Sequence, residues 1–490
     1  MGIDPASIAA GTLVPLAYIS IDNSEAVPDS VIQQLDTLFV GQKIAAGTAT
    51  EKVVDRITTV SQARALYGKG AQLTLALEAF FAINNGQTPV YAFSFDDVAG
   101  TAATGTLTVS SGPATEDGTL VFYVSGKKYE VTVTSGDTAT VVGDAIEAAI
   151  TADLNSAVTA NNVAGVVTLT AKNSGSVGNQ IQISGAIYSG EAPVPAGLAF
   201  AAVAMASGAT DPDVDDVFTN IGDTQYHIIS HPYNDTTSLG KMDVALADRF
   251  GPIKQNDGYA ITAKKDSVAN LVSAGNAENS PFNVLVGSVG IPSDTYAVAA
   301  AVAAQVSLEG SVDPARPFQT LPLTGILSPN ETSRANHTER NQMLGAGVAT
   351  VTVNSAGQMV VERVVTTYKT DANGEPDVSY QDLNTLLNLS TLRSSLRNRI
   401  NDKYPRHKLA NDGTRFAAGQ AVVTPSTIKA EIVALFNEWE ELGLVEDAGA
   451  FKSALVVNRD PSDQNRVNVL LKPDLINQMR IFAAVIRFIL

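Results

Sequence analysis

Two histidines stand at a spacing that metal sites use. His227 and His231 are four residues apart, which on a helix places two imidazoles on one face and suits zinc. The residues between them, however, are typical of a β-strand that ends before Pro232, and positions four apart in a strand are separated by about 13 Å. The glutamate of an HExxH motif is also missing. We therefore predict structural roles for both histidines and no bound metal.

Two further motifs suggest binding sites, but their spacing argues against them. Tyr67-Gly68-Lys69-Gly70 lacks the spacing and the Gly-Lys-Ser/Thr ending of a phosphate loop, so we expect a break between helices there. The aspartates between residues 211 and 216 lack the glycine and distal glutamate of an EF-hand. They predict an acidic first turn of the next helix. Because no GxSxG elbow occurs either, the sequence predicts no enzyme and no cofactor.

A basic cluster in the C-terminal region has three interpretations. It comprises Arg393, Arg397, Arg399, Lys403, Arg406 and Lys408. A solvated helix face, a nucleic-acid site, or a surface that docks on an acidic protein would each explain it. The chain has 32 Lys and Arg against 50 Asp and Glu, and its net charge of −18 opposes a phosphate backbone. Since Tyr404 is the one aromatic residue within the cluster, we expect no nucleic-acid partner.

Composition places the chain among large globular proteins. Its 490 residues suggest roughly three domains, and only 17% of them are charged, which leaves few like charges to hold copies apart. The absence of cysteine excludes disulfides, thiolate catalysis and Cys-ligated metals. No Lys or Arg precedes Lys43 and no apolar run is long enough to span a bilayer. We therefore expect neither export by the general route nor a membrane partner.

The order of the expected elements predicts an α/β (α+β) multidomain fold with a parallel-type core. Between residues 213 and 310 strands and helices alternate, as in βαβ units. Ser293 is expected to cap the last of these helices and Gly310 to lie just beyond its end. A further helix is predicted to begin at Thr424-Pro425 and to stop at Gly443.

A β-rich inserted domain is expected to interrupt this core. From residue 96 to 210 the composition shifts toward Gly, Thr, Ala and Val, and three lysines stand against ten acids (3 − 10 = −7). Five strands and one helix are predicted there, followed by a linker around Pro193 and Pro195. The predicted divisions are an N-terminal arm at 1–30, the core at 31–95 and 211–380, the insertion at 96–210, a C-terminal domain at 381–479 and a terminal arm strand at 480–490.

Both ends of the chain resemble arms that need a surface to lie against. Near the start, Pro15 disfavours a helix within a partly alternating apolar stretch, whose members are Val14, Leu16, Tyr18, Ile19 and Ile21. At the other end apolar side chains occupy both faces of an expected strand, with Ile481, Val485 and Ile489 on one face and Phe482, Ile486 and Phe488 on the other. A segment that is apolar on both faces requires burial.

Several segments resemble the contractile-tail sheath proteins of bacteriophages, specifically the Mu-like branch. They are Val14–Ser24, Asp313–Leu323, Tyr404–Ala410, Thr424-Pro425, and Lys472–Gln478 with the apolar tail that follows. The segment Asp313–Leu323 contains no residue pattern typical of an enzyme. The similarity covers most of the chain outside the insertion, which resembles the decorations that such sheaths carry.

The resemblance implies a mechanical function. Sheath subunits stack as helical rings around a tail tube, exchange strands through their terminal arms, and shorten together once triggered. It implies a homo-oligomer of the virion tail, assembled in the host cytoplasm, with tail tube, baseplate and tail terminator proteins as partners and no nucleotide as energy source. The arm residues named above would form subunit interfaces. The charge distribution along the chain suggests in addition that the basic C-terminal region faces the tube and the acidic insertion faces solvent. The residues expected to face the tube are Arg393, Arg397, Arg399 and Lys403.

Composition alone leaves alternatives open. A surface-layer or filament subunit is equally compatible with an acidic, cysteine-free chain rich in Thr, Ala and Gly. The α/β stretch and the strongly apolar C-terminus favour the sheath. An enzyme with an α/β core would require a pocket with converging polar groups and perturbed pKa values.

Overall fold

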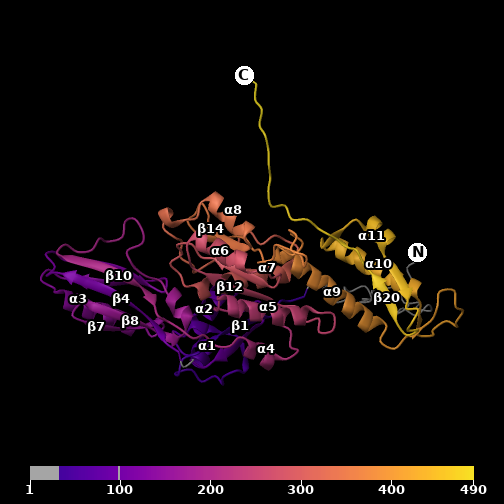
Figure 1. Cartoon of the computed structure of the whole chain (residues 1–490), viewed down its shortest axis with the longest axis horizontal. Coiled ribbons are helices and arrows are strands. Elements are labelled where there is room, and N and C mark those ends of the chain that lie inside the picture. Colours follow the sequence, from indigo (N-terminus) through magenta and orange to yellow (C-terminus); the bar gives the residue numbers. More distant parts are fainter. Residues whose placement is uncertain (1–32, 98–99, 490) are drawn as a thin grey trace, which may run out of the picture.

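The chain folds into an elongated molecule with three regions in a row (Figure 1). The computed structural model describes residues 33–97 and 100–489. A β-rich region lies at one end, an α/β core in the middle and a mainly helical C-terminal region at the other end, while the last residues extend away from the body. In the described ranges, no helix combines the length and apolar character needed to cross a bilayer.

The core is an eight-stranded, mostly parallel sheet. Its strands, in order across the sheet, are β15 (Met359–Arg363), β14 (Val348–Val353), β13 (Asn283–Gly287), β12 (Tyr259–Lys264), β11 (Ile228–Ser230), β1 (Thr37–Gln42), β3 (Val90–Phe95) and β2 (Val54–Ile57). The strands from β14 to β3 pair in parallel, and the edge strands β15 and β2 are antiparallel. β1 and β13 are buried along their whole length, as parallel strands covered on both faces must be. The parallel α/β core expected from the sequence is confirmed.

Helices cover this sheet. They are α1 (Val60–Tyr67), α2 (Gln72–Asn84), α4 (Asp215–Ile221), α5 (Thr236–Phe250), α6 (Val268–Ala277), α7 (Thr295–Val312) and α8 (His337–Gly345). α2 packs on α7, which is buried along most of its length because its many alanines admit close neighbours. Between α1 and α2, Gly68 and Gly70 have φ of 89° and 81°, so the expected helix break is confirmed.

The predicted end of α7 is wrong. The helix continues past Gly310 as far as Val312. A Cβ at Gly310 would lie 2.7 Å from Cδ1 of Leu35 and 3.4 Å from the Phe318 ring. This glycine therefore permits close packing of the helix and does not end it.

The described part of the insertion forms two sheets, one α-helix and a short 3-10 helix (Ser176–Gln180) around a buried cluster of its own. One sheet has the order β10 (Leu198–Ala206), β4 (Ala102–Ser111), β8 (Val166–Ser174), β7 (Val158–Val163), the other has β6 (Lys127–Val133), β5 (Gly118–Val124), β9 (Ile183–Gly185), and the helix is α3 (Ala139–Ala152). The sequence patterns assigned no strand to β7 or β10. In β10 the reason is a run of alanines, which are depleted in strands. Thr101 and Ala209 pair through their backbones, so the chain enters and leaves the insertion at one point.

Hydrogen bonds fix the insertion against the beginning of α7. The predicted N-cap Ser293 is wrong, because its hydroxyl accepts the Leu327 N–H at 3.0 Å and the N-cap residue is Asp294. The Asp294 side chain does not cap its own helix. It accepts hydrogen bonds from the Ser125 hydroxyl and, at 3.3 Å, from the Gln182 N–H, both in the insertion. Burial raises the pKa of this carboxyl group above its usual value.

A third buried cluster holds the C-terminal region together. α9 (Leu383–Lys403) connects it to the core, since Leu386 packs in the core cluster and Leu392 in the C-terminal one. The other elements are α10 (Pro425–Glu441), α11 (Ala448–Ala454) and the strand pairs β16 (Lys408–Leu409) with β17 (Val422–Val423), β18 (Val445–Glu446) with β21 (Asp474–Leu475), and β19 (Val456–Arg459) with β20 (Val467–Leu470). Thr424 caps α10 and Pro425 opens it, as predicted.

Candidate assembly interface

The two histidines belong to the core and flank β11. Both side chains are almost fully buried with the three-residue strand between them, so the expected strand is confirmed. His227 Nδ1 accepts the backbone N–H of Asp36 at 3.1 Å. Burial lowers the pKa of His227 and of His231 from 6.5 to about 4. Among the described residues, no group of three or more His, Asp and Glu side chains is placed to hold a metal ion.

The acidic first turn predicted for the next helix is present in α4, although no aspartate side chain caps this helix. Asp215 and Asp216 lie in the first turn of this helix. Lys241 Nζ lies between two of the acids, 2.6 Å from Asp213 and 3.0 Å from Asp215. This lysine therefore neutralises part of the acidic cluster from within the chain.

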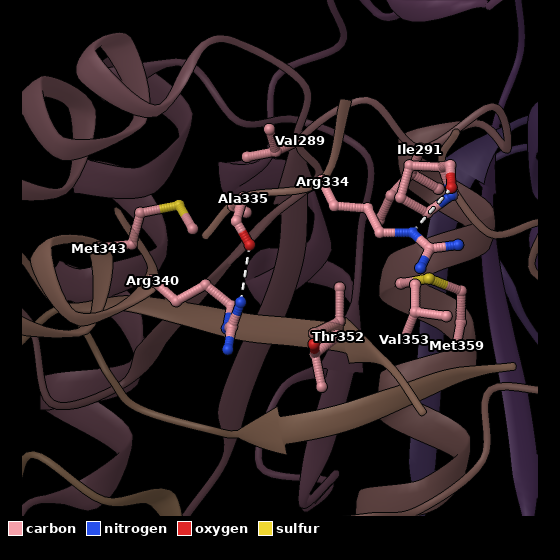
Figure 2. A pocket seen from close by; sticks show the side chains of 12 residues that line it. Val289, Ile291, Arg334, Ala335, Arg340, Met343, Thr352, Val353 and Met359 are labelled. Atoms are coloured by element: carbon pink, nitrogen blue, oxygen red, sulfur yellow. Dashed lines mark hydrogen bonds between the residues drawn. The ribbon is translucent and has the colours of Figure 1, made fainter. Parts of the chain in front are cut away.

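A cavity of about 270 Å³ opens at the carboxyl ends of β13 and β14, the edge at which α/β proteins bind ligands (Figure 2). Arg334 Nε donates to the Pro329 carbonyl at 3.2 Å. Arg340 Nη1 donates to the Ala335 carbonyl at 2.7 Å, and its Nε lies 2.9 Å from Glu362. The rest of the lining is glycine and apolar residues with one threonine. No pair of groups for acid–base catalysis converges in this cavity.

Part of the basic cluster on α9 docks on an acidic surface of the same chain. Arg399 lies 3.1 Å from Glu431 and also pairs with Glu438, and Lys403 lies 2.5 Å from Glu431. Both acids belong to α10. Burial alone would raise the pKa of Glu431, but hydrogen bonds from Lys403 and Arg399 lower it below its usual range. These charges hold two helices together within the subunit.

The other two basic residues expected at a tube contact the core. Arg393 Nη1 lies 2.8 Å from Asp257 Oδ1, and Arg397 donates to the Gln255 carbonyl at 3.2 Å. Both contacts join α9 to the loop after α5. The tube-facing role of the four basic residues stays a prediction. The structure shows that all four also have partners within the chain, which the sequence patterns did not indicate.

The last residues leave the body as an extended segment without secondary structure (Figure 1). All residues from 481 to 489, here called the C-terminal arm, are exposed. The large apolar side chains assigned to two strand faces are 78% to 99% exposed: Ile481, Phe482, Val485, Ile486, Phe488 and Ile489. The strand predicted here is therefore not formed in the single subunit, because a strand needs the hydrogen bonds of a partner. The N-terminal arm residues Val14, Leu16, Tyr18, Ile19 and Ile21 lie outside the described residues.

The hairpin β19–β20 has open strand edges. In the described chain it pairs with no third strand. α10 packs against β19. Val456 of β19 and Leu470 of β20, which are paired across the two strands, are nevertheless 44% and 52% exposed. A two-stranded hairpin is marginally stable alone, and its outer edges present unpaired backbone groups. The hairpin is thus a candidate acceptor for an added strand.

An α/β core, an open hairpin and an apolar arm that its own subunit leaves bare define a structural subunit of an assembly. The chain belongs to the phage tail sheath protein family. Residues 207–367 match the family model of the phage tail sheath protein central domain, and residues 375–489 match that of the phage tail sheath C-terminal domain. The chain is 39% identical to the Mu-like prophage FluMu tail sheath protein of Haemophilus influenzae, with 100% of both chains covered.

A solved structure shares the fold. A chain of the anti-feeding prophage baseplate in its contracted state is 11% identical, with a TM-score of 0.51 over 97% of this chain and 99% of that chain. The sheath tail protein Lin1278 of Listeria innocua is 12% identical, with a TM-score of 0.49 over 91% and 92% of the two chains. The full-length match to a tail sheath protein also removes the surface-layer and filament alternative.

Proposed function

We propose that this chain polymerises as helical rings around a tail tube, that the lattice contracts to drive the tube through a host envelope, and that terminal arms exchange strands between subunits. The C-terminal arm carries the proposal. Six large apolar side chains lie in water within a segment of nine exposed residues. Burial of each such side chain contributes about 1.5 to 3 kcal/mol, so a covering partner stabilises the arm strongly.

The hairpin β19–β20 of a neighbouring subunit is the acceptor that fits this arm. A strand added at one of its outer edges would satisfy open backbone groups, and alternate side chains of the arm would lie on the same face of the enlarged sheet as Val456 and Leu470. The nine exposed residues span about 30 Å when extended. That length is sufficient to reach out of one subunit and run along a short hairpin of another. The N-terminal arm is proposed to join the same sheet.

Contraction needs a connection that survives movement. The core and the C-terminal region are joined by α9, and arms bound through backbone hydrogen bonds would keep subunits linked while these bodies rotate. A difference of about a few kcal/mol per subunit between two lattices, summed over many copies, would drive the change without a nucleotide. We accordingly propose no enzymatic activity.

The first partner is a second copy of the chain. The tail tube, baseplate and tail terminator proteins are proposed as further partners in a virion tail that assembles in the host cytoplasm. The C-terminal region and the insertion lie at opposite ends of the molecule (Figure 1). If the C-terminal region with Arg397 faces the tube, the insertion with its charge of −7 (3 − 10) faces solvent.

Truncation after Arg480 tests strand exchange. The shortened protein should keep the thermal transition of the full chain, because every residue that it loses from 481 to 489 is exposed. It should sediment as single subunits or small oligomers and form no tubes in electron micrographs, whereas the full chain should form hollow striated tubes. Tubes from the truncated protein would refute the proposal. Loss of folding would place the arm within the core of its own subunit.

A further inference from the structure

The C-terminal arm begins at a junction between the core and the C-terminal region. Asn384, in the first turn of α9, donates to the carbonyls of Pro314 and Arg316 at 3.1 and 2.7 Å, and so holds the loop that follows α7. In this loop Ala315 is buried in the C-terminal cluster and Phe318 in the core cluster. The loop therefore links both regions, which gives the sheath-like segment Asp313–Leu323 a structural role.

A short strap crosses from the C-terminal region to this junction. β21 pairs with β18 through only two residue pairs. The Ile476 N–H then donates to the Leu444 carbonyl at 3.2 Å. Two residues later Gln478 Nε2 donates to the carbonyl of Ala315 at 3.0 Å. Residues 476–480 thus run from the C-terminal region to the loop that follows α7, which packs against both the core and the C-terminal region.

Arg480 completes this connection. Its Nη2 lies 3.1 Å from Oδ1 of Asp382, and its side chain is 17% exposed. Asp382 precedes α9 and also binds Arg363, whose Nε and Nη2 each donate at 2.9 Å. The next residue of the arm, Ile481, is 87% exposed. The boundary between held and exposed chain falls at Arg480.

We propose that Arg480 is the positioning residue of the C-terminal arm, because its ion pair with Asp382 fixes where the arm leaves the subunit and carries load from the arm into the core. The inference rests on the proposed strand exchange. Without this ion pair, here called the clasp, tension on the arm would act on the single hydrogen bonds of Gln478 and Ile476. Behind them lies only the two-residue pairing of β18 with β21, which is too short to be stable alone. Asp382 adjoins α9, so the load acts at the joint between core and C-terminal region.

Trypsin tests the clasp in the full chain, since Arg480 and the exposed Arg487 provide two cleavage sites in one segment. Cleavage after Arg487 should be at least tenfold faster than after Arg480. Asp382→Asn should speed cleavage after Arg480 at least fivefold and leave Arg487 unchanged. This variant keeps α9, because the Asp382 side chain makes no capping hydrogen bond. Arg480→Lys, which keeps a cleavage site, should give an intermediate rate.

The comparison of cleavage rates is made in one state of assembly, which sedimentation establishes for each variant. Equal rates at both sites in the unchanged chain would overturn the clasp. The same conclusion would follow if Asp382→Asn left cleavage after Arg480 unaltered.

Tube strength gives a second measurement. Arg480→Ala should leave the thermal transition of the subunit unchanged but yield tubes that shear to less than half their usual length. Arg487→Ala, the same change within the arm, is the matched control and should leave the length unaltered. If truncation after Arg480 leaves tubes intact, strand exchange itself fails. If truncation abolishes tubes and Arg480→Ala does not weaken them, only the clasp fails.

Discussion

Nη1 of Arg393 lies 2.8 Å from Oδ1 of Asp257, whose side chain is 3% exposed. The same nitrogen donates to the Phe250 carbonyl at 2.7 Å, and the guanidinium lies 4.1 Å from the centre of the Phe250 ring. Burial raises the pKa of Asp257, although Arg393 and Arg397 act to lower it. Arg393 therefore joins α9 to the core of its own subunit, whatever it faces in the sheath.

Arg393→Ala should lower the free energy of unfolding by about 2 kcal/mol, because it leaves a buried carboxylate without its partner. Arg397→Ala is the matched control on the same helix. It should change the free energy of unfolding by less than about 0.5 kcal/mol, because Arg397 makes one hydrogen bond to a backbone carbonyl. Chemical denaturation measures both values, and equal effects would mean that the Asp257 pair contributes nothing specific.

Charge reversal at Arg397 is consequently the cleaner test of a tube-facing surface. Arg397→Glu should weaken co-sedimentation of this chain with tail tubes. Raising the salt concentration should weaken the contact between sheath and tail tube more than the contact between sheath subunits. The reason is that ions screen exposed charges but not apolar burial or backbone hydrogen bonds. If the reversal spares tube-templated assembly and instead stops the protein from polymerising alone, the tube-facing assignment is mistaken.

Ile486→Asp should abolish tubes and leave the subunit folded. In the single chain Ile486 is 89% exposed, so the carboxylate stays in water, whereas in an assembled lattice it would be buried without a partner. Val378→Asp is the control, because Val378 is 74% exposed and lies outside the arm. Electron microscopy scores tubes and circular dichroism scores folding. Normal tubes from the Ile486 variant would show that this face of the arm is not covered.

Acid should destabilise the subunit partly through its buried histidines. The pKa of His231 in the folded chain is about 4, below the usual 6.5. As the pH falls from 6.5 to 4, this histidine therefore becomes protonated in the unfolded chain but stays neutral in the folded chain. The stability from the neutral imidazole is thus complete above about pH 6.5 and is lost as the pH falls toward 4. His231→Gln should reduce this loss by on the order of 2 to 3 kcal/mol.

The measurement is the free energy of unfolding at a series of pH values, taken as the difference between variant and unchanged chain. The same exchange at the exposed His407 is the matched control for replacing a histidine with glutamine. A parallel shift of the whole curve for His231→Gln would mean that only packing has changed.

Deletion of residues 96–210 with a short Gly/Ser linker should leave a folded core that still polymerises. The insertion has its own buried cluster, and the pairing of Thr101 with Ala209 brings its two ends together. A moderate loss of stability is expected, because Leu75 of α2 packs against the insertion and Asp294 loses its Ser125 and Gln182 donors. Calorimetry and sedimentation follow the outcome. If the remaining chain shows no cooperative transition, the segment is integral to the core.

Local patterns were sufficient for much of the fold. The alternation of strands and helices predicted the parallel core, glycines with positive φ marked the break between α1 and α2, and Thr424-Pro425 marked the start of α10. Each of these features depends on residues close together in the chain, whose spacing and backbone preferences are visible in the sequence. The apolar C-terminal arm was recognisable for the same reason, because its need for burial is a property of its own side chains.

Contacts between distant segments settled the rest. Gly310 lies within α7 and permits the close approach of Leu35, and the Asp294 side chain accepts hydrogen bonds from the insertion instead of capping its own helix. The partners of Arg393 and Arg480, and the bare surface of the arm beyond them, likewise follow from how the regions pack. Spacing along a chain does not encode which remote side chain fills a gap or neutralises a charge, since that depends on the three-dimensional arrangement of all the elements.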